Sequence, residues 1–384
     1  MDLAPLDPSQ QFCFNHECPD YGEVGKGNVY IHSYKERRYG CHPCKGTFAE
    51  TRGTMFYRLR TPPETIGDAI AQLVERGSIR GVARAKGVFA RHGHRVAAPG
   101  RRARRRSQRV LDAGPAPDRG PSGRTLDLCE KKQKNLSADE DTGGNDGDLI
   151  GDAWIWQAVD VPSRLRIASH LSHARGEDDA TAFIGQGKAR SDEQAPLFQS
   201  DGLPASTAAL VANYSEPEPP PFKRGPGRPR TQPKRLRDPD LRSTQVDKRK
   251  EKGRVVEVSR RIVFGQPAAI AEVIERGGGA SQGNTAYVER NNLTLRQTNG
   301  RLVRKALSYS KDAALLYWST ELDDAVYNLT HQHWALRQRP AEPETAGRKW
   351  CPRTPAMAAG LTDHPWTLLE LLTFKVPPSR SGGT

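Results

Sequence analysis

The chain contains no run of 18 apolar residues, so a membrane-spanning helix is not expected. The first eleven residues lack a basic stretch followed by an apolar one, and we therefore expect no secretory signal. Acidic residues number 45 against 59 lysines and arginines, which leaves a formal net charge of +14. This excess predicts a nucleic-acid partner, although a basic solvated surface without a partner has the same composition. A length of 384 residues favours two or three domains.

Cysteine is scarce and unevenly placed, because four of the six lie within the first 44 residues. Cys13 and Cys18 form one close pair, and Cys41 and Cys44 form a second. Two such pairs on two turns can supply the four ligands of a tetrahedral Zn²⁺ ion. Between them, residues 28–39 alternate as two short strands. The pattern predicts a zinc ribbon over residues 10–55, with structural Zn²⁺ bound by the four cysteines.

Three histidines, His16, His32 and His42, lie close enough in sequence to replace a ligand. A lone histidine near a zinc site is more often a bystander. The ribbon is also basic, which leaves two interpretations open: a purely structural module, or one that also contacts DNA phosphates.

Residues 61–88 predict part of a helix-turn-helix. Apolar positions recur on one helical face from Glu64 to Arg76, and Gly77 ends this helix. Ser78 can cap a second helix, which Gly87 closes. A recognition helix should follow, but no helical or strand period appears there.

Residues 89–130 form an irregular basic segment rich in Arg, Gly, Pro and Ala. A disordered linker is one interpretation. The alternative is a shifted reading frame, since GC-rich codons read one base forward let Phe89–Gly100 encode a helix beginning Ser-Pro-Asp. The same shift lets Leu126–Lys132 encode a β-strand. We hypothesise that this segment is translated out of frame, and codons unable to encode that helix would contradict the hypothesis.

Residues 131–310 predict a catalytic domain in a multi-domain α/β protein. The order is two hairpin strands, a helix, a strand ending in Asp201, and a late basic helix from Val288 to Leu307. This is the order of an RNase H-like domain, a mixed sheet with helices. Residues 311–384 predict a helical tail, in which Trp350, Trp366 and Leu368–Leu372 pack back on the core.

Two carboxylates stand at positions suited to metal binding. Asp201 ends a strand before a glycine turn, and Glu289 begins a helix. DNA cutting by in-line attack uses divalent metals held by carboxylates, here Mg²⁺ or Mn²⁺. Taken alone, each carboxylate is more often an ordinary capping or surface residue.

Several motifs together resemble those of one protein family. They are the cysteine pairs, Arg37–Tyr39, Ser78–Gly81, Lys131–Gln133, Ser200–Pro204, Tyr287–Arg296, and Tyr327–Asn328 leading to His333. The set resembles transposases of the insertion sequence one family, over residues 12 to about 377 with an interruption at 89–130. The resemblance implies a DDE triad with a divalent metal, and binding of the terminal repeats of a mobile element. It further implies a homo-oligomer on double-stranded DNA in the bacterial cytoplasm, at the nucleoid.

The resemblance implies that Asp201 is the second Asp of the triad and that Glu289 is its Glu. The first Asp would fall at Gly123 or Arg124, where the shifted frame can encode Asp but this chain has none. Asp127 can serve only if the strand slips. The chain also has His331 and Gln332 where the family usually has Arg-Pro.

Further positions are candidates for DNA contact. Arg290, Asn291 and Arg296 can face phosphates from the late helix. A basic, proline-rich insert, residues 216–250, contains a stretch that resembles an AT-hook, with Arg224, Gly227, Arg228 and Arg230 as its contacts. A solvated basic loop is the alternative for the insert.

Two functions follow from these features. The first is a transposase that cuts and joins DNA by two-metal phosphoryl transfer, inactive in this copy if the first Asp is missing. The second is a non-catalytic zinc-ribbon DNA-binding protein or regulator derived from a transposase. A zinc-ribbon accessory factor of RNA polymerase or the ribosome explains the cysteines but not Asp201 and Glu289.

Overall fold

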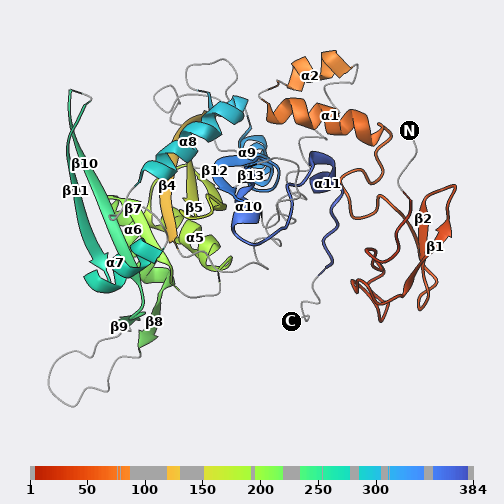
Figure 1. Cartoon of the computed structure of the whole chain (residues 1–384), viewed down its shortest axis with the longest axis horizontal. Helices are drawn as coiled ribbons and strands as arrows, with labels where there is room; N and C mark the ends of the chain where they lie inside the picture. The colour runs from red at the N-terminus through yellow and green to blue at the C-terminus, as the bar shows by residue number, and fades with distance from the viewer. Residues whose placement is uncertain are drawn as a thin grey trace, which may run out of the picture.

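The computed structural model describes residues 5–75, 77, 79–86, 119–129, 151–191, 195–218, 234–252, 254–276, 285–303, 310, 312–340 and 349–378. These residues form a mixed α/β protein with several separate sheets (Figure 1). For strand β4 (Arg119–Cys129), the structure describes the backbone and its pairing with neighbouring strands, but not the side chains.

The N-terminal module contains a three-stranded antiparallel sheet in the order β1-β2-β3. The strands are β1 (Val29–Ser33), β2 (Arg38–Cys41) and β3 (Thr47–Ala49). Tyr39, paired with Ile31 on one side and Phe48 on the other, is 1% exposed. Its ring packs with Val29 and Phe48 in a small core. The two strands predicted from the alternation of residues 28–39 are therefore present.

Two helices follow where the sequence predicts them, α1 (Pro63–Val74) and α2 (Ile79–Lys86). The apolar face of α1 is buried, because Ile66 and Ile70 pack against Met55, Phe56 and Leu372. An ion pair between Lys86 Nζ and Asp68 Oδ2, 2.8 Å apart, joins α2 to α1. The expected recognition helix would lie outside the described residues.

A six-stranded sheet lies at the centre of the larger part of the chain, in the order β11-β10-β7-β4-β5-β6. Its strands are β4 (Arg119–Cys129), β5 (Gly151–Val159), β6 (Arg166–Ser172), β7 (Leu197–Asp201), β10 (Arg242–Glu251) and β11 (Arg254–Phe264). β5 runs antiparallel to its neighbours β4 and β6, whereas β4, β7 and β10 run parallel. A crossover between parallel strands requires a covering helix, which this chain supplies.

Two segments that were predicted to lack regular secondary structure form strands of the central sheet. Arg119–Cys129, which falls in the predicted irregular segment, forms the central strand β4. Arg242–Lys250, which its composition placed in the basic insert, forms most of β10. Each strand pairs with a neighbour on both sides, and such pairing overrides a weak local pattern. The sheet domain therefore begins before residue 131.

Helices cover both faces of the sheet. On one face, α5 (Glu177–Lys188) and α6 (Pro204–Asn213) pack on Trp156 and Ala168. On the other, α8 (Ala286–Thr298) and α9 (Ala313–Leu329) pack on Ala153 and Ile155 through Leu295 and Leu316. The faces alternate along β5, as the pleat requires. This alternation places Gln157 on the α8 face.

Helix α8 is shorter than the predicted Val288–Leu307. It ends at Thr298, and the side chain of Asn299 accepts a hydrogen bond from the backbone N–H of Arg301 at 3.1 Å. A 3₁₀ turn, Gly300–Leu302, then changes the direction of the chain. Helix α7 (Pro267–Arg276) lies on the same face of the sheet as α8 and α9, with Ile270 and Ile274 packed against Leu197 of β7.

Two small hairpins and two short helices complete the described chain. They are β8 (Ser215–Glu218) with β9 (Lys234–Arg237), β12 (His333–Gln338) with β13 (Cys351–Arg353), α10 (Pro355–Ala358) and α11 (Leu368–Thr373). Leu371 and Leu372 of α11 are 0% and 2% exposed, and Trp366 packs beside them on the core. The predicted packing is present for Trp366, Leu371 and Leu372, whereas Leu369 is 50% exposed. The tail predicted to be helical also contains the β12–β13 hairpin, and Trp350 contacts Arg337 and Arg339 there.

Candidate functional site

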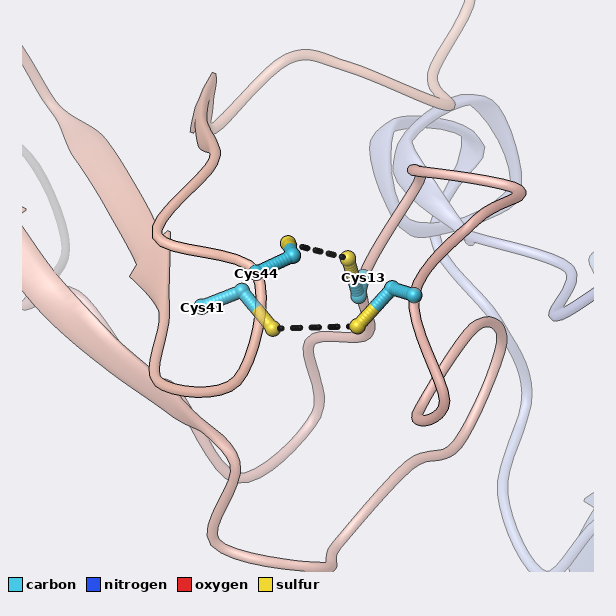
Figure 2. A group of neighbouring side chains, drawn as sticks. Cys13, Cys41 and Cys44 are labelled. Atoms are coloured by element: carbon cyan, nitrogen blue, oxygen red, sulfur yellow. Dashed lines mark hydrogen bonds between the residues drawn. The ribbon is translucent and has the colours of Figure 1, made fainter.

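Four sulfur atoms come together in the N-terminal module (Figure 2). The Sγ atoms of Cys13 and Cys44 are 3.6 Å apart, those of Cys18 and Cys41 are 3.7 Å apart, and all four lie within 4.8 Å of one another. A Zn–S bond of about 2.3 Å places tetrahedral sulfurs roughly 3.8 Å apart, whereas a disulfide needs about 2.0 Å. The predicted cluster therefore has dimensions compatible with a structural zinc site.

The surroundings of these thiols also suit a cation. Burial raises the pKa of the Cys13 thiol and of the Cys41 thiol. Burial acts in the same direction on Cys44, but a hydrogen bond from the Gly46 backbone and the neighbouring sulfurs lower its pKa to about 7. The Cys13 and Cys41 thiols, whose pKa burial raises, would become thiolates on binding a metal ion, so acid should release a bound metal.

The histidines near this cluster lie against tyrosines. The His16 ring packs on Tyr21 with 4.3 Å between centroids, and the His42 ring packs on Tyr30 at 4.5 Å. Within the part of the chain that the structure describes, the four cysteines form the one group of three or more side chains placed to hold a metal. The bystander interpretation fits these histidines.

Asp201 lies at the carboxyl end of β7, exposed, where the register pairs it with Val246 of β10. The next residue, Gly202, has no room for a side chain, because the carboxylate of Asp247 lies against it. A Cβ atom on residue 202 would lie 1.8 Å from Oδ1 of Asp247. The glycine turn predicted after Asp201 therefore lets a second carboxylate, Asp247, come close to the end of the strand.

Glu289 lies in the first turn of α8, with 58% of its side chain exposed. Lys248 Nζ of β10 donates a hydrogen bond to Glu289 Oε1, and the Thr285 hydroxyl donates to the same oxygen at 3.2 Å. Lys248 is two residues beyond Val246, the partner of Asp201. Glu289 is thus connected through Lys248 to the sheet edge at which Asp201 lies.

The register of β4 locates position 123, one of the two positions at which the resemblance implies the first Asp. Pro121 pairs with Gln199 of β7, so continuing two residues places Gly123 level with Asp201. On its other side Gly123 pairs with Gln157 of β5. Residues paired across a sheet share a face, and Gln157 is on the α8 face. The pairing of β4 with β7 ends at Pro121 and Gln199; continued in the same register, it would bring position 123 beside Asp201, on the face covered by the helix that carries Glu289.

Asp127 stands farther along the same strand, opposite Ala153 of β5. It is four residues beyond Gly123, which at roughly 3.3 Å per residue corresponds to about 13 Å. The strand would have to slide by four residues to bring Asp127 level with Asp201.

A buried polar network anchors α8 to the sheet. The Asn291 side chain donates to Gln157 Oε1 and accepts from Arg166 Nε at 2.7 Å. Arg166 is 2% exposed and also pairs with Asp323 of α9. The network fixes the start of α8 over β5 and β6.

The predicted DNA contacts differ in their availability. Arg290 is exposed and Arg296 is half-buried on α8. Asn291 is 4% exposed, and its amide binds partners within the protein, so it does not face solvent phosphates. Arg224, Gly227, Arg228 and Arg230 lie outside the described residues.

The sequence-based predictions missed two features, the Arg166 network and an exposed tryptophan on β12, Trp334. The first had no local signal, because its members come from β5, β6, α8 and α9. The second had one: Trp334 and Trp350 flank Arg337 and Arg339 in the sequence.

No model of a protein family matches the chain, and no curated protein matches its sequence. Among the described helices, none has both the length and the apolar character needed to cross a membrane.

Proposed function

We propose that the chain is a DNA transposase of the insertion sequence one type, with an RNase H-like catalytic domain whose carboxylate set is incomplete in this copy. It would bind the terminal repeats of a mobile element as a homo-oligomer on double-stranded DNA. The observation that carries the proposal is the register of β4, which pairs Pro121 with Gln199 and Gly123 with Gln157, and which two residues further on would bring Gly123 level with Asp201 on the α8 face.

The arrangement of the sheet supports the RNase H-like part of the proposal. β4, β5 and β6 form an antiparallel meander, and β7 then runs parallel to β4. β7 ends at Asp201, and in the register that pairs Pro121 with Gln199 this end would lie level with Gly123 in the middle of β4. α8 packs on β4 and β5 and brings Glu289 to this side.

The carboxylates present fit a divalent metal only in part. Asp201 and Glu289 offer the oxygen ligands that Mg²⁺ or Mn²⁺ prefers, but position 123 offers none. A metal pair, when bound, would activate the attacking water and stabilise the leaving oxygen. With one carboxylate absent, we derive no cleavage step for the chain as it stands.

The second candidate is a DNA-binding protein that no longer cuts DNA. The ion pair of Lys248 with Glu289 favours it, because a lysine then occupies the carboxylate that a metal would need. Gly123 also favours it, because a glycine offers no oxygen ligand from a side chain at that position. In this case the ribbon, the α1–α2 pair and the basic surfaces would retain DNA binding without catalysis.

Strand cleavage tests the first candidate against the second. The substrate is a duplex carrying the repeats that bracket the gene, incubated with Mn²⁺ and either the chain as it stands or its Gly123→Asp variant. We expect no cleavage by the first. We expect the Gly123→Asp variant to cleave the duplex at a rate roughly a thousandfold or more above that of the unaltered chain. Removing a catalytic group lowers rates by a factor on that order.

Two further variants serve as controls in the same assay. Asp201→Asn or Glu289→Gln, each combined with Gly123→Asp, should abolish the cleavage gained. If the unaltered chain cuts as well as the Gly123→Asp variant, the proposed gap is wrong. If neither cuts although both bind the duplex, the non-catalytic function holds.

A further inference from the structure

The β12–β13 hairpin exposes an aromatic ring. Trp334 of β12 is 65% exposed, although a tryptophan side chain is usually largely buried. The guanidinium of Arg337 lies 4.7 Å from the Trp334 ring and 4.8 Å from the Trp350 ring. Arg339 lies 5.7 Å from Trp350. Two indoles and two guanidinium groups thus form one aromatic and cationic surface.

This surface is rigidly supported from below. Arg337 Nη1 donates to the carbonyl oxygen of Trp334 at 3.1 Å, and Arg353 Nε donates to that of Leu336 at 2.9 Å. Leu336 and Thr354 are 7% and 0% exposed. These contacts fix the backbone that carries Trp334, so the ring is presented from an ordered hairpin.

The two described strands of the hairpin and the residues beside them carry charge of one sign. Residues 330–340 and 349–360 contain no Asp or Glu, and they include Arg337, Arg339, Lys349 and Arg353. The segment between them, 341–348, contains Glu342, Glu344 and Arg348 and lies outside the described residues. A solvated surface on a chain with 45 acidic residues would ordinarily mix both signs. The hairpin therefore favours an anionic ligand with flat, stackable groups.

The base of the hairpin lies near the helix that carries Glu289. The ring of His333, next to Trp334, lies 5.1 Å from the Tyr327 ring. The guanidinium of Arg166 contacts the Tyr327 ring at 3.8 Å, and Arg166 Nε donates to Asn291 of α8. Arg290 directly follows Glu289 on α8, and Arg164 lies 3.7 Å above the Tyr287 ring on the same helix. Arg164 and Arg290 thus place positive charge at the start of α8, whereas the charge of Arg166 is buried and compensated by Asp323 and Asp324.

We propose that the β12–β13 hairpin binds single-stranded DNA, with an unpaired base stacked on Trp334 and the neighbouring phosphates held by Arg337 and Arg339. Stacking on an indole requires a free base face, which a duplex does not offer. Guanidinium groups beside the ring suit the phosphates that flank a stacked base. Single-stranded DNA offers both a flat base for stacking on the indole and phosphates for the guanidinium groups, whereas an acidic protein surface offers only the negative charge.

This inference shares with the proposed function only a DNA partner, and it does not depend on a working carboxylate set. Binding is therefore measured without divalent metal. The probe is a fluorescently labelled oligo(dT), titrated with the zinc-loaded full-length chain and followed by anisotropy, with a duplex of equal length as the second probe.

We expect Trp334→Ala to weaken oligo(dT) binding about tenfold, the effect of losing one base–aromatic stack. Trp334→Phe, which keeps an aromatic ring, should restore most of the affinity. Duplex binding should change less than about threefold, because base faces are covered there. Tyr34→Ala is the matched control, since Tyr34 is 74% exposed on the zinc-ribbon module and should leave oligo(dT) binding unchanged.

Far-ultraviolet circular dichroism confirms that each variant is folded. Unchanged oligo(dT) binding by Trp334→Ala would overturn the proposal. The proposal would also be overturned if Trp334→Ala lost affinity equally for oligo(dT) and for duplex, or if Tyr34→Ala lost as much oligo(dT) affinity as Trp334→Ala. A third contradicting result would be that Trp334→Ala loses affinity for an oligo(U) ribonucleotide but not for oligo(dT). Cleavage by Gly123→Asp with unaltered oligo(dT) binding in Trp334→Ala would support the proposed function and overturn this inference alone.

Discussion

Arg166 of β6 and Asp323 of α9 form a buried ion pair, with 2.7 Å between Nη1 and Oδ2. Asp324 contributes a second contact to the same nitrogen at 3.0 Å, and the guanidinium lies 3.8 Å from the Tyr327 ring. Burial alone would lower the pKa of Arg166, but the two carboxylates outweigh it and raise the pKa. The arginine is therefore charged inside the protein and depends on its partners.

Removing one partner of this pair should destabilise the fold strongly. Asp323→Ala leaves a buried charge with less compensation, and we expect a loss of about 3–5 kcal/mol in the free energy of unfolding, measured in urea. Glu251→Ala, which breaks the exposed Arg249–Glu251 pair, should cost less than about 1 kcal/mol. Equal effects of the two variants would contradict the structural role of Arg166.

The cysteine cluster should bind zinc. Purified protein should carry about one Zn²⁺ per chain, and Cys41→Ser should lose it because a thiolate ligand is removed. Cys351→Ser is the control, since Cys351 is half-buried and lies outside the cluster. Metal content after dialysis, measured by atomic emission, distinguishes the variants. Retention of zinc by Cys41→Ser would mean that another residue completes the site.

Acid should reduce the contribution of His333 to the free energy of unfolding. Burial lowers its pKa from the ordinary 6.5 to about 4, and the positive charges of His331, Arg164, Arg166 and Arg290 act in the same direction. The folded protein binds this proton more weakly than the unfolded chain. The contribution of the neutral imidazole is therefore present above pH 6.5 and is lost as the pH falls toward 4.

The free energies of unfolding of the unaltered chain and of His333→Gln test this dependence at pH 7 and at pH 4.5. The stability advantage of the unaltered chain should shrink at the lower pH. Because His333 is only half-buried, the change should be well below the roughly 1.4 kcal/mol per pH unit of a fully buried group. A constant difference between the two proteins would show that His333 titrates normally.

Local sequence patterns predicted the parts of the fold that depend on neighbours in the chain. The paired spacing of Cys13, Cys18, Cys41 and Cys44 anticipated the sulfur cluster, because turn geometry alone brings such pairs together. The apolar face of α1 and the alternation along β5 also follow from the periodicity of residues close in sequence.

The features that depend on distant pairing were harder to predict. Nothing in Arg119–Cys129 has the alternation of a strand, yet β4 pairs with β5 and β7 at the centre of the sheet. Asn291 was expected to face phosphates, but Gln157 and Arg166, more than 120 residues away, bury its amide. Such contacts are set by topology, which local periodicity does not encode.

The central claim is that a carboxylate at position 123 would complete a metal site with Asp201 and Glu289. Mn²⁺ binding, followed by the electron paramagnetic resonance signal of the free ion, tests it directly. We predict that Gly123→Asp binds Mn²⁺ at least about tenfold more tightly than the unaltered chain, since even indirect partners of a metal contribute that much. Adding Asp201→Asn or Glu289→Gln should remove the gain, and adding Asp127→Asn should not. No gain in Gly123→Asp, or a gain that disappears with Asp127→Asn, would contradict the account.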